Sequence, residues 1–259
     1  MGEAIKKFGW KRSDLVITTK VDSPPHACVS GTILTDGQLN WGLANGEILI
    51  NNHGLSRKHI VEGTRASLER LQLEYVDIIY AHRPDRLTPM EETVRAFNHV
   101  IDKGWAFYWG TSQWSADEIT EACGIAKALG LVAPIVEQPL YNMLDRTKVE
   151  GEFQRVYSRC GIGLTTFSPL KMGLLSGKYN NATTQPPPGS RFAESKDTFA
   201  SSVRQDWENK EWSGTIKKIV DLKVGSTLVF RFPVSGADIC RHCRIDWASS
   251  CPNLPWHGV

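Results

Sequence analysis

The alternation of strand-like and helix-like segments between residues 70 and 170 most constrains the fold. Short apolar, β-branched or aromatic runs recur at intervals of roughly 30 residues, with helical stripes of apolar residues between them. This rhythm is typical of βα units that build a parallel sheet. Together with one earlier run, it predicts strands over residues 15–19, 76–80, 106–109, 135–137 and 163–167.

Cap residues mark the helices between these strands. Ser56 is an N-cap residue before a helical stripe that runs to residue 71, and Ser115-x-x-Glu118 is a capping box. Gly130 and Gly161 follow the last apolar residue of two further stripes and predict helix ends there. The same spacing predicts helices over residues 1–9, 90–101 and 212–222, and residues 39–52 are expected to form a loop.

Each predicted strand is followed by a polar residue. Pro84 prevents the strand that leads to His82 from continuing. In a (β/α)8 barrel such residues converge on one face, whereas in a doubly wound sheet they line a crevice. The absence of a GxGxxG motif after a strand disfavours the doubly wound sheet. A histidine bonded to a loop carbonyl is the alternative to a ligand-facing His82. The polar residues that follow the five predicted strands are Lys20, His82, Ser112, Gln138 and Ser168.

Length and charge exclude several classes of protein. The 259 residues suit one barrel-sized domain or two small ones. A net charge of +2 gives no reason to expect a nucleic acid or membrane-surface partner. No apolar run approaches about 20 residues, and the N-terminus lacks the apolar core of a signal peptide. We expect a cytoplasmic protein without membrane insertion.

The cysteines indicate no metal site. Cys240-x-x-Cys243 has a spacing used by zinc ligands, but no second pair with matching context follows. The expectation is therefore unpaired thiols in a reducing compartment. The six cysteines are Cys28, Cys123, Cys160, Cys240, Cys243 and Cys251.

Three segments of the chain resemble the aldo-keto reductase superfamily. They are GLSRKHIVEGTRASLERLQLEYVDIIYAHRPD, TPMEETVRAFNHVIDKGWAFYWGTSQWSADEI and FSPLKMGLLSGKY, between residues 54 and 179. The most similar branch holds the β-subunits of voltage-gated potassium channels and their fungal and plant reductase relatives. The resemblance implies a (β/α)8 barrel that uses NADPH to reduce an aldehyde or ketone by hydride transfer.

The resemblance also implies catalytic residues. The family tetrad consists of Asp, Tyr, Lys and His, in which the tyrosine protonates the carbonyl oxygen and the lysine lowers its pKa. Lys20 matches the lysine and His82 matches the histidine that orients the substrate oxygen. Several channel β-subunits have asparagine at the position of His82, so this histidine favours a working reductase.

The cofactor contacts of the family carry over in the same way. Ser112, Gln113 and Gln138 match residues that hold the nicotinamide amide, and Phe167 matches an aromatic residue near the ring. Arg191 matches a basic residue in the loop that folds over the cofactor. The segment that wraps the pyrophosphate matches Ser168, Pro169, Leu170, Lys171 and Lys178.

The chain departs from the family at both ends. No residue matches the Asp or the Tyr of the tetrad, which precede the helix that Met1 to Gly9 resembles. We therefore expect residues 1–223 to form an incomplete barrel without strands 1, 2 and 8, and to be inactive in this form. Unpaired sheet edges of this kind promote aggregation, so we also expect instability in isolation.

Two stretches look foreign to the family. Removing residues 21–38 joins Lys20 to Leu39 and restores a family-like sequence. Val21 can be encoded by a codon that begins with GT and Gln38 by CAG, as at the ends of an intron. Residues 224–259 also begin with valine and show no helical stripe. We interpret the first stretch as a retained intron and the second as a foreign tail; a genuine surface insertion is the alternative for the first.

Two kinds of function remain open. One is an NADPH-dependent reductase of a small carbonyl substrate. The other is a regulatory binding protein like the potassium channel β-subunits, with a homotetramer or a channel subunit as its partner.

Overall fold

The computed structural model describes residues 1–21, 43–44, 47–48, 54–181, 185–195, 200, 203–204, 207 and 214–221. The chain divides into two compact units, Met1–Phe167 and Ser168–Val259, and each is described by itself. The proposed insertion at residues 21–38, apart from Val21, and the proposed tail at 224–259 lie outside the described residues.

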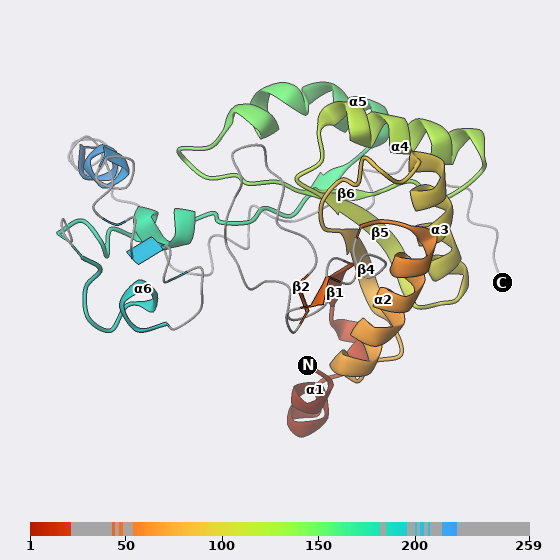
Figure 1. Cartoon of the computed structure of the whole chain (residues 1–259), viewed down its shortest axis with the longest axis horizontal. Helices are drawn as coiled ribbons and strands as arrows, with labels where there is room; N and C mark the ends of the chain where they lie inside the picture. The colour runs from red at the N-terminus through yellow and green to blue at the C-terminus, as the bar shows by residue number, and fades with distance from the viewer. Residues whose placement is uncertain are drawn as a thin grey trace. The chain divides into compact units, whose positions relative to one another are not determined.

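A five-stranded parallel sheet forms the centre of the first unit (Figure 1). Its order β1-β4-β5-β6-β7 follows the chain, and every pairing is parallel. Such sheets require connections that cross over one face, which the intervening helices provide. The predicted α/β class is confirmed, and the arrangement is that of part of a (β/α)8 barrel. The strands are β1 (Thr18–Val21), β4 (Val76–Ala81), β5 (Ala106–Ser112), β6 (Val136–Gln138) and β7 (Gly163–Leu164).

Four helices cover one face of this sheet. Each contacts the next in chain order, from α2 through α3 and α4 to α5 (Figure 1). The helices of this unit are α1 (Gly2–Phe8), α2 (Arg57–Leu71), α3 (Met90–Asp102), α4 (Ala116–Ala128) and α5 (Gln154–Cys160). A 3-10 turn (Arg12–Asp14) precedes β1, and a π-helical turn (Lys148–Glu152) precedes α5.

The predicted caps are confirmed. The Ser56 side chain accepts a hydrogen bond from the His59 amide at the start of α2. Ser115 and Glu118 form the reciprocal capping box of α4. Gly161 ends α5 in the left-handed conformation, which satisfies a terminal carbonyl at no steric cost.

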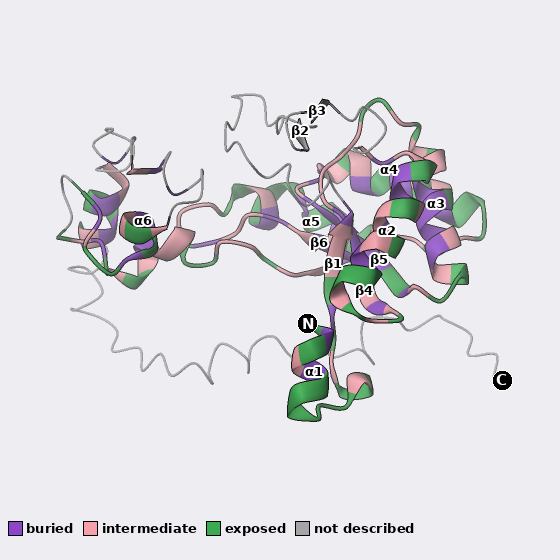
Figure 2. Cartoon of the chain, turned by 60° about the horizontal axis from the view of Figure 1, so that its bottom comes forward, coloured by how far each residue is buried: buried purple, intermediate pink, exposed green. Residues whose placement is uncertain are grey.

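The main core lies between the sheet and the helices. Figure 2 shows buried residues on α3 and α4 and exposed residues elsewhere on the same helices. At its centre the ring of Phe97 from α3 stacks on Trp109 from β5, with 4.8 Å between ring centroids. Buried Asn98 donates to the carbonyl of Val132 and accepts from its amide, which ties α3 to the segment between α4 and β6.

The opposite face of the sheet carries a much smaller apolar cluster. It consists of Ile78, Tyr80 and Val136, with Ile135 packed against it. Gly110 lies between them on β5, and a Cβ atom there would come within 2.5 Å of a Val136 methyl group. Tyr108, further back on β5, remains 41% exposed. We call this the inner face, because it corresponds to the interior of a barrel.

Several predicted boundaries were wrong. β1 begins at Thr18 rather than Leu15, since the Asp77 carboxylate binds the Ile17 amide at 2.7 Å before the ladder starts. β5 continues to Ser112, and β7 ends at Leu164. In the expected loop at 39–52, β2 (Leu43–Ala44) pairs antiparallel with β3 (Glu47–Ile48). Asn-Gly lies between them in the sequence and is a strong hairpin signal.

The second unit is described in parts. A 3-10 segment (Lys171–Ser176) and α6 (Arg191–Glu194) are its named elements, and residues 214–221 are helical, within the predicted helix at 212–222. Its buried centre is aromatic. The Tyr179 ring lies 5.7 Å from Phe192 and 5.2 Å from Trp207, measured between centroids.

Candidate functional site

The two predicted catalytic residues lie at one edge of the sheet. Lys20 pairs in register with Tyr80 on the neighbouring strand, and the His82 amide donates to the Val21 carbonyl at 3.3 Å. Both side chains are half-buried. Lys20 is inside β1 rather than just beyond it, which corrects the sequence interpretation. Lys20 and Tyr80 are 60 positions apart in sequence, and parallel pairing brings them together at the carboxyl edge of two adjacent strands.

The next two strands add the predicted amide-binding residues. Ser112 pairs with Gln138 in register, and its hydroxyl donates to the Gln138 carbonyl at 3.0 Å. Gln113 adopts a positive φ of 62°, and its side-chain oxygen accepts from the Leu140 amide at 3.0 Å. The side chain of Gln113 therefore binds the chain just beyond β6, whereas Ser112 and Gln138 remain side by side at the strand ends.

Two residues that the sequence did not single out join this edge. An Arg83 guanidinium nitrogen lies 3.3 Å from the Ser112 hydroxyl, and Arg83 also donates to the His82 carbonyl. Thr165 accepts from the Gln138 side-chain nitrogen at 3.3 Å. Arg83 directly follows His82 in the sequence. Thr165 shares a face of the predicted strand with Gly163 and Phe167, because side chains two residues apart point to the same side. Both residues could therefore have been predicted to lie at this edge.

Tyr80 is the buried tyrosine of the inner face. Burial raises the pKa of its hydroxyl, and the hydrogen bond with Thr165 only partly opposes this effect. The Lys20 ammonium lies 5.7 Å from the centroid of the Tyr80 ring, which is a cation–π distance. A tyrosine that protonates a carbonyl needs a lowered pKa, so Tyr80 is a poor substitute for the family acid.

Phe167 closes the first unit at the same edge. It forms a parallel bridge with Leu140, and its amide donates to the Pro139 carbonyl at 3.0 Å. Its ring is half-buried. Phe167 thus continues the line of strand ends beyond β7, next to the segment that follows Gln138.

The predicted pyrophosphate segment has an unusual backbone. Ser168, Lys171 and Met172 have φ values of 52°, 43° and 57°, in the left-handed region. Successive turns of this kind can present several N–H groups to an anion. A Cβ atom at Gly173 would lie 2.7 Å from Cε of Lys178, so the lysine stem covers this glycine closely. Pro169 and Leu170 are exposed.

Arg191 begins α6 in the same unit. The helix is capped by Ser190, whose hydroxyl accepts from the Ala193 amide at 3.3 Å. The Arg191 side chain is exposed. The ten predicted cofactor residues are therefore divided between the two units: four, from Ser112 to Phe167, belong to the first unit, and six, from Ser168 to Arg191, belong to the second. The two predicted catalytic residues, Lys20 and His82, also belong to the first unit.

Glu137 is a buried carboxylate beside the amide-binding residues. It pairs in register with Thr111, and its exposed fraction is 0%. Burial raises the pKa of Glu137 to about 7, although the Thr111 hydroxyl and the Lys148 charge lower it. Because side chains alternate along a strand, Glu137 faces away from the side of β6 that carries Gln138.

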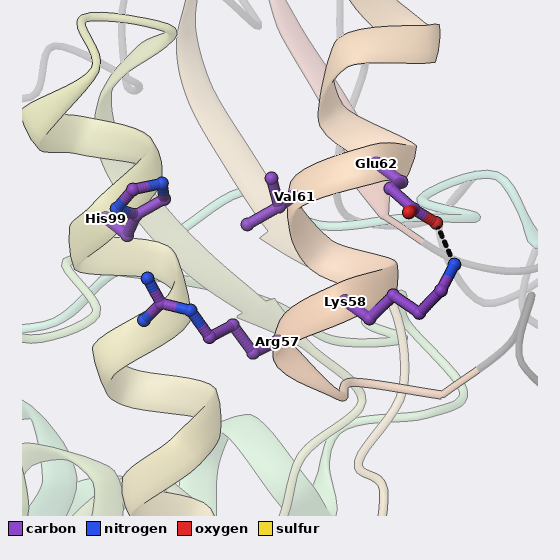
Figure 3. A pocket seen from close by; sticks show the side chains of 5 residues that line it. All are labelled: Arg57, Lys58, Val61, Glu62 and His99. Carbon is purple, nitrogen blue, oxygen red and sulfur yellow. Dashed lines mark hydrogen bonds and ion pairs between the residues drawn. The ribbon is translucent and has the colours of Figure 1, made fainter.

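A shallow pocket lies elsewhere, on the outside of the helix layer. Arg57, Lys58, Val61 and Glu62 of α2 and His99 of α3 line it (Figure 3). Lys58 and Glu62 form an ion pair along α2, and Figure 3 shows the Arg57 side chain extending toward His99. The pocket carries charged groups of both signs, as is usual for solvent-exposed helix surfaces. None of its lining residues is part of the candidate site.

Neither a metal cluster nor a membrane helix occurs within the described ranges. These residues contain no group of three or more His, Cys, Asp or Glu side chains that could hold a metal ion. Among the same residues no helix is both long and apolar enough to span a membrane. Cys240 and Cys243 lie outside them.

The whole sheet-and-helix region matches one known family. Residues 1–222 match the description "Aldo/keto reductase family". The chain belongs to the aldo/keto reductase family. This confirms the resemblance inferred from the sequence, and it agrees with a parallel sheet whose carboxyl edge gathers Lys20, His82, Ser112 and Gln138.

Two curated relatives of the chain are plant proteins. A "probable voltage-gated potassium channel subunit beta" of Arabidopsis thaliana is 49% identical over 255 residues, which cover 98% of this chain and 66% of the relative. A protein of the same description from Oryza sativa subsp. japonica is 47% identical over the same length and the same shares. The chain thus spans slightly less than two thirds of these relatives.

Proposed function

We propose that this chain binds NADPH at the carboxyl edge of its parallel sheet and derives from an aldo/keto reductase that reduces small aldehydes or ketones. The observation that carries the proposal is the convergence of side chains from four consecutive strands at that edge. Lys20 and His82 adjoin through β1 and β4, and Ser112 and Gln138 pair through β5 and β6. Family membership supports the same assignment.

The residues at the edge fit the nicotinamide end of the cofactor. A carboxamide requires both a donor and an acceptor, which Ser112 and Gln138 supply as neighbours. The Gln138 nitrogen is oriented by Thr165, so its amide oxygen can accept from the cofactor. The half-buried ring of Phe167 supplies an aromatic surface. NADPH, when bound, supplies the hydride.

The residues proposed for the phosphate groups all belong to the second unit. The left-handed backbone of Ser168, Lys171 and Met172 suits an anion, and Lys178 adds a positive charge over Gly173. Arg191, exposed at the start of α6, adds a second charge. Pro169 and Leu170 complete the proposed segment.

His82 and Lys20 serve the substrate side of the proposal. The His82 imidazole orients the carbonyl oxygen of a small substrate, and the Lys20 charge stabilises negative charge that develops on that oxygen. No tyrosine of this sequence takes the role of the acid, since Tyr80 has a raised pKa and its hydroxyl bonds Thr165. We therefore propose that this chain alone binds the cofactor but reduces carbonyls very slowly. We also propose a cytoplasmic location, with which membership of the reductase family is compatible.

NADPH binding to the purified chain tests the proposal. Quenching of tryptophan fluorescence should give a saturable curve, and Gln138→Leu should weaken binding by about tenfold, the effect of losing one hydrogen bond. Gln154→Leu is the matched control, because it makes the same change at an exposed position of α5. Absence of quenching in the unaltered chain, or equal affinity in all three proteins, would contradict the proposal.

A second candidate is a regulatory subunit of a potassium channel. The descriptions of the two plant relatives as channel β-subunits favour it, with 49% and 47% identity. In this case the chain docks on a channel, with or without forming a homotetramer. Co-purification with a co-expressed voltage-gated potassium channel supports this candidate. If the chain binds NADPH but does not co-purify with the channel, only the reductase assignment remains.

A further inference from the structure

Two cysteines that are far apart in sequence meet between neighbouring helices. Cys123 lies in the second half of α4, and Cys160 is the last residue of α5. The two helices pack side by side over the sheet (Figure 1). The side chains of Cys123 and Cys160 lie within hydrogen-bonding contact of each other. Both are free thiols.

The surroundings hold this pair in place without sealing it. Both cysteines are half-buried and pack against the main core. The buried Ala122 and Ala126 of α4 and Val156 of α5 fix the two helix faces on which they lie. Neither cysteine is fully buried, and the packing of α4 on α5 keeps the two side chains close. Proximity of this kind favours an intramolecular disulfide over two separate adducts.

We propose that Cys123 and Cys160 form a reversible disulfide by exchange with a low-molecular-weight disulfide of the glutathione class. One thiolate attacks a sulfur of the small disulfide, which gives a mixed disulfide and releases one small thiolate. The second cysteine then attacks the protein sulfur of the mixed disulfide and releases the other small thiolate. The protein loses two electrons and two protons. The small disulfide gains both and becomes two thiols.

The environment assigns an order to the two steps. Burial, and secondarily the contact with Cys160, raise the pKa of the Cys123 thiol well above its ordinary value. A thiol with a raised pKa is rarely ionised and is a poor first nucleophile. The first exchange is therefore assigned to Cys160, the last residue of α5, beside the left-handed Gly161. Cys123 then completes the bond, because it is held against the mixed disulfide.

The cross-link would enclose a functional part of the sheet. The segment between the two cysteines contains β6, with Glu137 and Gln138. A disulfide fixes α4 to α5 and restricts the unfolded chain, so the oxidised protein should melt at a higher temperature than the reduced protein. This inference does not depend on cofactor binding or on activity.

Peptide mapping of the full chain tests the proposal. The folded protein is incubated with oxidised glutathione, its remaining thiols are blocked with N-ethylmaleimide, and it is digested with trypsin. We expect peptide 104–127 linked to peptide 160–171, with a loss of about 2 Da for the two hydrogen atoms. Dithiothreitol should separate the two peptides again.

Variants and unfolded protein provide the controls. Cys123→Ser should leave glutathione attached to Cys160, because no second thiol resolves the mixed disulfide. In denaturant the 123–160 link should give way to other pairs, mainly Cys240–Cys243, which are close in sequence. The proposal is overturned if folded protein carries separate glutathione or maleimide groups on both cysteines. It is also overturned if either cysteine pairs with Cys28, Cys240, Cys243 or Cys251. Both of these outcomes are measured on the unaltered protein.

Discussion

The hydroxyl groups of Tyr80 and Thr165 lie 2.9 Å apart, although β5 and β6 separate β4, which contains Tyr80, from β7, which Thr165 directly follows. In a flat sheet, three strand spacings would put these backbones about 14 Å apart. That distance exceeds what a tyrosine and a threonine side chain span together. The sheet must therefore curve strongly around its inner face, as the sheet of a barrel does.

A double-mutant cycle tests the contribution of this contact. Tyr80→Phe and Thr165→Val should each lower the free energy of unfolding by about 1 kcal/mol, since each removes a hydrogen bond from a largely buried hydroxyl. The double variant should lose clearly less than the two single variants combined. Urea denaturation of the four proteins measures this coupling. Additive losses would show that the two hydroxyl groups do not interact in solution.

The glycine of the inner face should be intolerant of a side chain. A Cβ atom at Gly110 would lie 2.5 Å from a methyl group and 2.6 Å from the carbonyl oxygen of Val136. Gly110→Ala should therefore reduce stability by about 1–3 kcal/mol through overpacking. Gly124→Ala is the matched control: nothing lies within 4 Å of the new methyl group, and Gly124 is inside α4. That change should stabilise by about 0.5–1 kcal/mol. Similar melting temperatures for both variants would contradict the close packing at Gly110.

The sequence predicted the order of elements well because local chemistry decides it. Ser56, the Ser115–Glu118 capping box and Gly161 act within one helical turn, and the structure has each of them where it was predicted. The predicted strand boundaries were wrong where tertiary contacts determine the end of a strand. Asp77 binds the Ile17 amide before β1, and β7 is only two residues long, and neither could be read from β-propensity.

The candidate site was predicted less completely than the fold. Residues at strand ends were found, since a parallel sheet places them together by topology. Contacts across the inner face, such as Tyr80 with Thr165, depend on curvature that no local pattern encodes. The contact between Cys123 and Cys160 depends on the packing of α4 on α5. The proposed insertion at 21–38 and tail at 224–259 stay predictions, which sequencing of the transcript can test.

Asp85 should stabilise the segment that follows His82. Its carboxylate accepts from the Leu55 amide at 2.8 Å, the Thr88 hydroxyl at 2.7 Å and the Leu87 amide at 2.9 Å. Asp85→Asn replaces one acceptor oxygen with a donor and should cost about 2 kcal/mol. Asp102→Asn, at the exposed end of α3, is the control and should change stability little. Chemical denaturation at neutral pH measures both. Equal stability of the two variants would show that the Asp85 contacts contribute nothing.

Acid should weaken the same contacts. Burial raises the pKa of Asp85, but its hydrogen bonds lower it by more, so the net pKa lies below the ordinary value of 3.8. The contribution of Asp85 is therefore present above pH 3.8 and is lost as the pH falls through its pKa in the folded protein. Asp85→Asn should be less sensitive to acid than the unaltered chain over this range. A parallel loss of stability in both proteins would contradict this assignment.

Glu137 should make stability depend on pH in the opposite direction. Its pKa is about 7 in the folded protein against 4.5 in the unfolded chain, so the unfolded state releases the proton first as the pH rises. The free energy of unfolding is then highest below pH 4.5 and falls until the pH passes about 7. Glu137→Gln removes this loss. Between pH 5 and pH 8 it should gain about 2–3 kcal/mol relative to the unaltered chain. Urea denaturation at the two pH values measures the gain. Glu121→Gln, at an exposed position of α4, should show no such change. A constant difference between Glu137→Gln and the unaltered chain at both pH values would mean that the buried carboxyl keeps an ordinary pKa.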